Sequence, residues 1–175
     1  MPDAALSEAL KEAYATAPVG QVVHHTLEFW HPAFTLPIRV VRDVTALDAR
    51  LEAGAPRDGG EVVTFVGYAF DILPPDQTAT GLPQCTIEID NVSREILAQV
   101  DAAVVGTDKI EVIYRPFLSD ALDEGPETDP PLAMAVQTIS ATPMRIRATA
   151  GFPDLLNARF PRLRYTSDRF PGLAR

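Results

Sequence analysis

Three histidines are the residues of this sequence best suited to acid–base chemistry or metal binding. His24 and His25 are adjacent within residues 21–30, QVVHHTLEFW, a run rich in β-branched and aromatic side chains that predicts a strand. Neighbours on a strand point to opposite faces, whereas metal ligands must converge on one ion. His31 lies at the end of the run, with no third ligand nearby. We therefore interpret the histidines as structural or surface residues and predict no metal site.

Cys85 is the only cysteine, which excludes a disulfide within the chain. A cysteine nucleophile needs a base, and all three histidines precede Cys85 in the chain, whereas papain-like and related peptidases place the cysteine before the histidine. Cys85, Ile87 and Ile89 alternate with polar residues, which predicts a half-buried strand with Cys85 on its apolar side. The sequence favours a buried, inert thiol.

Residues 119–130 carry five carboxylates and no basic residue. Their spacing does not match the 1, 3, 5 pattern with glycine at position 6 of an EF-hand calcium loop. A solvated loop is the first interpretation, and a weak cation site or a surface for a basic partner are the alternatives. The chain also lacks a phosphate-binding glycine loop and a G-x-S-x-G motif. We therefore expect no catalytic residues and no cofactor, and a protein that is not an enzyme.

The composition is that of one soluble, acidic domain. The 175 residues are 46% hydrophobic and carry a net charge of −9, which disfavours DNA or an anionic membrane as partner. No apolar run reaches the roughly 18 residues of a membrane helix, and residues 1–14 lack the features of a signal peptide. We expect no sequence-specific nucleic-acid binding, no membrane insertion, and folding in a reducing compartment.

The elements that must position these residues are mostly strands. Sixteen prolines favour short extended segments separated by loops. Periodicity predicts a helix over 3–16 capped by Asp3, one or two helical turns over 45–53, and a second helix from 93 to about 105. It predicts strands over 21–30, 37–43, 61–73, 85–90, 109–118, 131–141 and 143–150, the third covered on both faces.

This pattern has no βαβ rhythm. It predicts a mostly-β α+β fold, an antiparallel β-sandwich or split barrel with two packed helices. Residues 1–157 form a single domain in this interpretation, and residues 158–175 an extended C-terminal arm.

The charges divide the chain unevenly. From Pro143 onward there are seven arginines and two acids, a net charge of +5, against −14 in the rest. A basic tail on an acidic body is complementary to a second copy, and such a head-to-tail contact closes into a ring if the rotation allows. The alternative is a tail folded over its own body. Arginines and aromatic residues of the arm are the candidate interface residues: Arg159, Phe160, Arg162, Arg164, Tyr165, Arg169 and Phe170.

Several blocks of the sequence occur together in one order. They are AYATAPVGQVVHHTLEFWHPAF, PIRVVRD, EVVTFVGYAFDI, LPQCTIEIDNVSREI, IEVIYRPFL and FPRLRYTSDRFPGL. Over nearly the whole chain this series resembles a family of uncharacterised tail proteins of siphovirus-type phages and prophages. The most specific block, Pro83–Ile96, is similar to a stretch of lambda-type minor tail proteins and tail-hub proteins.

The resemblance implies a structural protein of the tail tip in the virion, assembled in the host cytoplasm. The implied role is that of a distal-tail-like ring or adaptor, in which six copies join the tail tube and the tape-measure protein to the baseplate hub proteins. Alternatives are a trimeric hub-side minor tail protein and a carbohydrate-binding baseplate module. No catalytic residue carries over from the family. The expected strand-to-helix junction carries Asn91, Arg94 and Glu95. These residues would fix the geometry of the junction or contact the next subunit.

Overall fold

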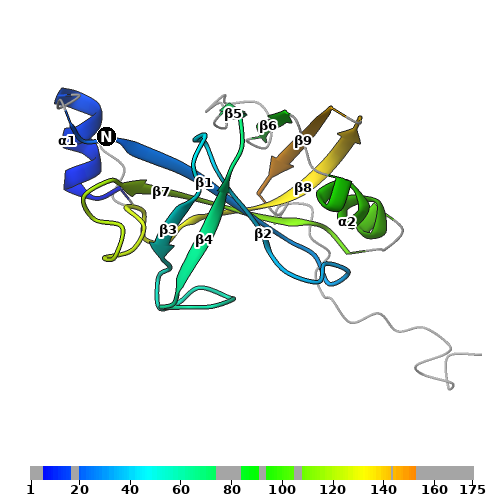
Figure 1. Cartoon of the computed structure of the whole chain (residues 1–175), viewed down its shortest axis with the longest axis horizontal. Coiled ribbons are helices and arrows are strands. Elements are labelled where there is room, and N and C mark those ends of the chain that lie inside the picture. The colour runs from blue at the N-terminus through cyan, green and yellow to red at the C-terminus, as the bar shows by residue number, and fades with distance from the viewer. Residues whose placement is uncertain are drawn as a thin grey trace, which may run out of the picture.

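The computed structural model describes residues 6–16, 20–73, 84–90, 94–104, 108–142 and 144–152. Within these ranges the chain forms two short helices and nine strands (Figure 1). In chain order they are α1 (Glu8–Thr16), β1 (Val23–Trp30), β2 (Ile38–Val41), β3 (Leu47–Arg50), β4 (Val62–Gly67), β5 (Phe70–Leu73), β6 (Gln84–Asp90), α2 (Arg94–Val104), β7 (Glu111–Leu118), β8 (Leu132–Ala141) and β9 (Arg145–Gly151). The prediction of a mostly-β α+β fold is confirmed. The expected boundary between residues 157 and 158, and the C-terminal arm, lie outside the described residues.

The strands form one mixed sheet in the order β3-β4-β2-β1-β7-β8-β9-β6-β5. Every pairing is antiparallel except that of β2 with β4, which is parallel. The end strands, β3 and β5, do not pair with each other, so the sheet is not closed. The prediction of an antiparallel sandwich or split barrel is therefore replaced by a single open, mixed sheet.

The chain connection between β4 and β5 requires this sheet to curl. β4 ends at Gly67 and β5 begins at Phe70, although six strands lie between them in the sheet. In a flat sheet the two strands would be roughly 34 Å apart at about 4.8 Å per step. Three consecutive Cα–Cα steps span at most about 11 Å. The sheet therefore bends until β5 lies near the end of β4, as Figure 1 shows.

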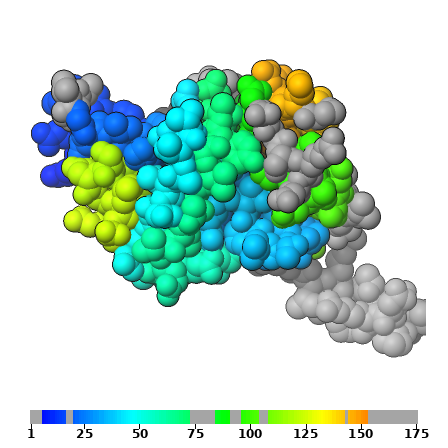
Figure 2. Space-filling view, viewed as in Figure 1, coloured from blue at the N-terminus to red at the C-terminus, as the bar shows by residue number. Residues whose placement is uncertain are grey.

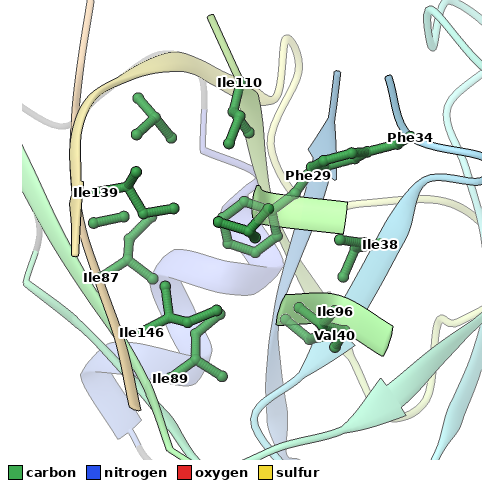
Figure 3. Close-up of a pocket in the computed structure, with 13 residues that line it drawn as sticks. Phe29, Phe34, Ile38, Val40, Ile87, Ile89, Ile96, Ile110, Ile139 and Ile146 are labelled. Atoms are coloured by element: carbon green, nitrogen blue, oxygen red, sulfur yellow. The ribbon is translucent and has the colours of Figure 1, made fainter. Parts of the chain in front are cut away.

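The main hydrophobic core fills the inside of this curl. On β1, Leu27 and Phe29 face it, and α2 contributes Val100 and Ala103. Figure 3 shows Phe29, Ile87 and Ile146, from three different strands, around a small internal cavity. The cavity measures about 30 Å³ and its lining residues are all apolar. A space of this size and polarity is a packing void, since it holds about one water and offers it no hydrogen bond.

A second layer covers the outer face of the central strands. The β3–β4 hairpin crosses in front of β1 and β7 (Figure 1), and its side chains form a separate apolar cluster with Val41 of β2 and Phe117 of β7. This outer cluster consists of Val41, Ala49, Leu51, Val63, Phe65 and Phe117. Phe65 and Phe117 meet with their ring centroids 5.8 Å apart. β1 and β7 are thus buried on both faces, which matters for the polar residues they carry.

The prediction of helical turns over residues 45–53 is wrong. Residues Leu47–Arg50 form β3, which pairs with β4 from Leu47↔Phe65 to Arg50↔Val62. Leucine, alanine and arginine are among the best helix formers, but intrinsic propensity is a small effect, and pairing with a partner strand over a buried face outweighs it. Ala49 is fully buried in the outer cluster, which explains why this segment is extended.

The prediction of one strand over residues 61–73 is also wrong. The run is divided into β4 and β5, and β4 alternates exposed and buried residues rather than being covered on both faces. Gly67 stands at the division. A Cβ atom there would lie 2.7 Å from the carbonyl oxygen of Asp43, so the turn after β2 can pass this position only because the residue is glycine.

The first helix begins later than the sequence suggested. α1 starts at Glu8, and Ser7 caps it, since the Ser7 hydroxyl accepts the Leu10 amide at 3.0 Å. The same hydroxyl donates to the Glu127 carboxylate. Asp3, the predicted cap, lies outside the described residues. No helix in the described part of the chain is both long and apolar enough to span a bilayer.

Candidate functional site

The interface residues chosen from the sequence fall mostly outside the described part of the chain. Arg94 and Glu95 form the first turn of α2. Asn91 lies outside the described residues, as do the arm residues Arg159, Phe160, Arg162, Arg164, Tyr165, Arg169 and Phe170. Whether these residues share one surface therefore stays a prediction.

The block with the most specific resemblance forms β6, and its alternation is as predicted. Ile87 and Ile89 are buried in the main core. Glu88 and Asp90 lie on the opposite face, where they pair with arginines of the neighbouring β9. Arg145 Nε lies 2.5 Å from Asp90 Oδ1, and Arg147 forms an ion pair with Glu88. The hydrogen bond from Arg145 to Asp90 and the charge of Asp90 raise the pKa of the guanidinium.

A wide cleft of about 760 Å³ lies where the curled sheet meets itself, and we call it the seam cleft. Its lining residues come from the ends of β2, β4, β5, β6 and β9: Arg42, Asp43, Val44, Tyr68, Ala69, Phe70, Asp71, Glu88, Asp90 and Arg145. Arg42 contacts Asp71 at 2.8 Å across it. Arg42 and Asp71 are a solvent-exposed pair, of the kind that contributes at most about 1 kcal/mol. The lining carries two arginines and four carboxylates, so the cleft is acidic overall.

A cluster of charged residues that was not predicted from the sequence is buried between the sheet and the β3–β4 hairpin. Glu28 of β1 and Arg115 of β7 have fully buried side chains, and Arg115 Nη1 donates to Glu28 Oε2 at 3.0 Å. Arg115 also makes two 2.8 Å hydrogen bonds to Glu52. Arg39 and Arg57 approach Glu28 from the rim, at 3.4 and 3.2 Å. We call these five residues the buried charge cluster.

The buried charge cluster is built to fix geometry. Glu28 meets three arginines, and Arg115 meets two carboxylates in the fork geometry that guanidinium groups favour. The cluster therefore fixes the position of β1 and β7 relative to the loop that carries Glu52. One signal was available in the sequence, because a charged residue at the centre of a predicted apolar strand is costly unless it is paired.

The histidines lie apart from one another, and each has its own contact. His24 Nδ1 is 3.6 Å from the Asp43 carboxylate. His31 is buried, accepts the Ala33 amide on Nδ1 at 3.1 Å, and so donates from Nε2 to the Asp108 carbonyl at 3.2 Å. Within the described residues no three His, Cys, Asp or Glu side chains are grouped to hold a metal ion.

His25 predicts an acid-sensitive stability. Its Nδ1 lies 2.7 Å from the Tyr114 hydroxyl, and its ring stacks on that of Tyr114. Burial lowers the pKa of His25, and the charges of Arg42 and His24 lower it further. Because the unfolded chain then binds the proton more readily, stability is present above pH ~6.5 and is lost as the pH falls through the lowered pKa. The variant His25→Gln should lose less of its unfolding free energy than wild type between about pH 7.5 and pH 5.5. Urea unfolding at both pH values checks this, and identical losses would contradict it.

Cys85 is predicted to stay unreactive while the protein is folded. Its side chain is fully buried, and burial raises the pKa of the thiol to about 11. At about pH 8 this lowers the thiolate fraction by roughly two orders of magnitude relative to an ordinary cysteine. An aromatic disulfide reagent should therefore label no thiol in the native protein and one thiol per chain in denaturant. Rapid labelling of the native protein would show that β6 opens readily.

The acidic loop 119–130 is only partly solvated, because it packs against α1 and β3. The Ser7 amide donates to the Glu127 carbonyl at 3.0 Å, and the Arg50 amide to the Leu122 carbonyl at 2.9 Å. Figure 2 shows this yellow-green loop next to the cyan β3–β4 hairpin.

Between these two parts of the surface lies a groove of about 720 Å³, which we call the acidic groove. Its lining residues include three acids and no basic residue: Glu52, Ala53, Gly54, Pro56, Ile113, Glu124, Gly125, Pro126, Thr128, Asp129, Pro130, Pro131 and Ala133.

Comparison with known proteins identifies a family whose function is unknown. The sequence model of a family described as a domain of unknown function (DUF1833) matches residues 9–165. No curated protein matches the chain.

Proposed function

The chain belongs to the family of the DUF1833 domain of unknown function, and we propose that it serves as a structural component of a siphovirus-type phage tail tip. In this role it is a distal-tail-like ring or adaptor that joins the tail tube to the baseplate hub. Its partners are further copies of itself in a hexameric ring, the tail tube protein, the tape-measure protein and the baseplate hub proteins. Its place is the virion, after assembly in the host cytoplasm.

The observation that carries this proposal is the resemblance of an ordered series of blocks, over nearly the whole chain, to tail-gene proteins. The most specific block forms β6 and leads into α2, and the side chains of β6 alternate as the residue pattern predicts. Several charged residues of the described chain form ion pairs that fix strands to one another, in the buried charge cluster and between β6 and β9. A sheet held in this way suits a structural role.

The carbohydrate-binding alternative receives no support from the single tryptophan. The Arg57 guanidinium lies over the Trp30 ring, 4.8 Å from its centroid. Arg57 is held there by Glu28 and Glu111, at 3.2 Å each. That face of the ring is covered and offers no platform on which a sugar could stack.

The test is a count of this protein in purified particles by quantitative mass spectrometry, scaled to the main tail-tube protein. Near six copies per particle is the expected result. Near three copies would assign the protein to the hub side, and a multiple of the fibre number would assign it to a peripheral receptor-binding part. Absence from the particle would overturn the structural role.

A further inference from the structure

We propose that the acidic groove receives the arginine-rich C-terminal arm, residues 158–175, of a neighbouring copy. The contact is head to tail, since the arm of one copy enters the groove of the next. This inference deepens the proposed function and rests on it for the ring, but the contact itself can be tested on the isolated protein.

The groove is suited to bind a segment that carries both cationic and apolar side chains. Its floor is apolar, formed by Ile113 of β7 and Ala133 of β8, which are partners in the sheet. Its walls carry the carboxylates of Glu52, Glu124 and Asp129. Arg115 pairs with Glu52, whereas Glu124 and Asp129 are solvent-exposed residues. A segment that fits must combine positive charge with large apolar side chains.

A buried hydroxyl in the wall points independently to an occupant. Thr128 lines the groove and is only 7% exposed, yet its Oγ1 has no hydrogen-bond partner in the described structure. Buried side-chain hydroxyls are paired in the large majority of cases, because an unpaired one costs on the order of 1–3 kcal/mol. Because this oxygen has almost no exposed surface, a guanidinium or amide N–H of an incoming segment reaches it only by displacing part of the wall.

The arm has the complementary composition. Residues 158–175 contain five arginines and one acid. Between the arginines stand Phe160, Leu163, Tyr165, Phe170 and Leu173. Arginine and aromatic side chains are enriched at the centres of interfaces, where an apolar contact is combined with a charge-assisted hydrogen bond.

The chain beyond the described end is long enough to reach the groove of another copy, while Gly151 pairs with Ala135, two residues from Ala133 of the groove floor of its own chain. Phe152 packs against the main core, inside the curl of the sheet. The groove floor lies on the other face of the sheet, because Ile113 alternates with Val112, which faces the main core. The residues after 152 number 23, which extended span up to roughly 75 Å, more than the roughly 40 Å width of a domain of this size. The arm is therefore long enough to cross onto a neighbour.

The experiment uses full-length chains with opposite charges exchanged. A groove variant carries Glu124→Lys and Asp129→Lys, and an arm variant carries Arg162→Glu and Arg164→Glu. A matched control carries Asp101→Lys and Asp108→Lys, the same charge change at exposed positions on α2 and just after it. Sedimentation velocity at low salt measures association, and circular dichroism checks that each variant folds. The arm variant leaves every described residue unchanged, so its result does not depend on how the groove tolerates substitution.

We expect wild type and the control to associate, with dissociation constants that rise with salt. Each charge-exchange variant alone should bind at least tenfold more weakly. Their equimolar mixture should associate again, because the arm of each variant then meets a groove of opposite charge on the other. The chain that carries all four exchanges should associate with itself again.

A monomeric wild type, or unchanged association of either variant, would overturn the inference. So would a mixture that fails to associate although wild type does, since the arm would then bind elsewhere. These outcomes differ from a failure of the proposed function. A chain present at six copies per particle, yet monomeric in solution, would refute the arm–groove contact alone, whereas absence from the particle would leave the measured contact standing.

Discussion

Replacing Arg115 with methionine is expected to lower the free energy of unfolding by about 3–5 kcal/mol. Arg115 is the hub of the buried charge cluster, fully buried and bonded to both Glu28 and Glu52. Its removal leaves the Glu28 carboxylate in the interior with only the two rim arginines, at 3.2 and 3.4 Å. Methionine fills most of the volume, so the loss reports the uncompensated charge rather than a cavity.

Arg42→Met is the matched control for this prediction. Arg42 also pairs with a carboxylate, at 2.8 Å from Asp71, but both side chains are at least half exposed. Its loss should change stability by at most about 1 kcal/mol. Urea unfolding followed by circular dichroism measures both variants at neutral pH. Equal small changes would mean that the buried charge cluster is hydrated and contributes little to stability.

Replacing Phe65 with alanine is expected to cost about 3–5 kcal/mol of unfolding free energy. Phe65 is fully buried in the outer cluster and packs against Phe117 of β7. Truncation leaves a cavity between the β3–β4 hairpin and the central strands, where the surrounding strands cannot collapse far. The size of the loss therefore measures how firmly the second layer belongs to the folded domain.

The neighbouring Val66 gives the control on the same strand. Its side chain points to the opposite face and is 50% exposed, so Val66→Ala should cost less than about 1 kcal/mol. The same denaturant titration compares the two. If Phe65→Ala cost no more than Val66→Ala, or if it split the unfolding curve into two transitions, the hairpin would be an independent flap rather than a layer of the domain.

The strands that could be predicted from sequence are those whose local pattern matches their surroundings. β6 alternates cleanly because the side chains on one face meet the core, whereas those on the other face are near solvent and pair with arginines of β9. The β8–β9 hairpin is sequence-local, so its pairing follows from a short connection. β3 could not be predicted, because its extended form depends on β4 and not on its own residues. The division between β4 and β5 was hidden for the same reason, since a run of apolar residues does not reveal that its two halves pair at opposite ends of a sheet.

The candidate surfaces depend even more on distant contacts. The charge asymmetry between body and arm could be predicted from composition alone, and it is the one feature of the candidate surfaces that the sequence revealed. The acidic groove could not be foreseen, because its walls come from two loops that meet only after the hairpin folds over β7. Glu28 and Arg115 were individually visible as charges within apolar strands. Their pairing was not, since it joins residues 87 positions apart.

That separation has a consequence for how the chain is made. β1 and β7 are the central pair of the sheet, yet β7 leaves the ribosome long after β1. At roughly 5–20 residues per second, the 87 intervening positions take about 4–17 s to synthesise. During that interval β1 already has β2 and Arg39 beside it, but its other edge lacks β7 and Glu28 lacks Arg115. Nascent chains are therefore expected to expose an unpaired strand edge until β7 emerges, and completed chains to fold within the milliseconds to seconds typical of long-range strand pairing.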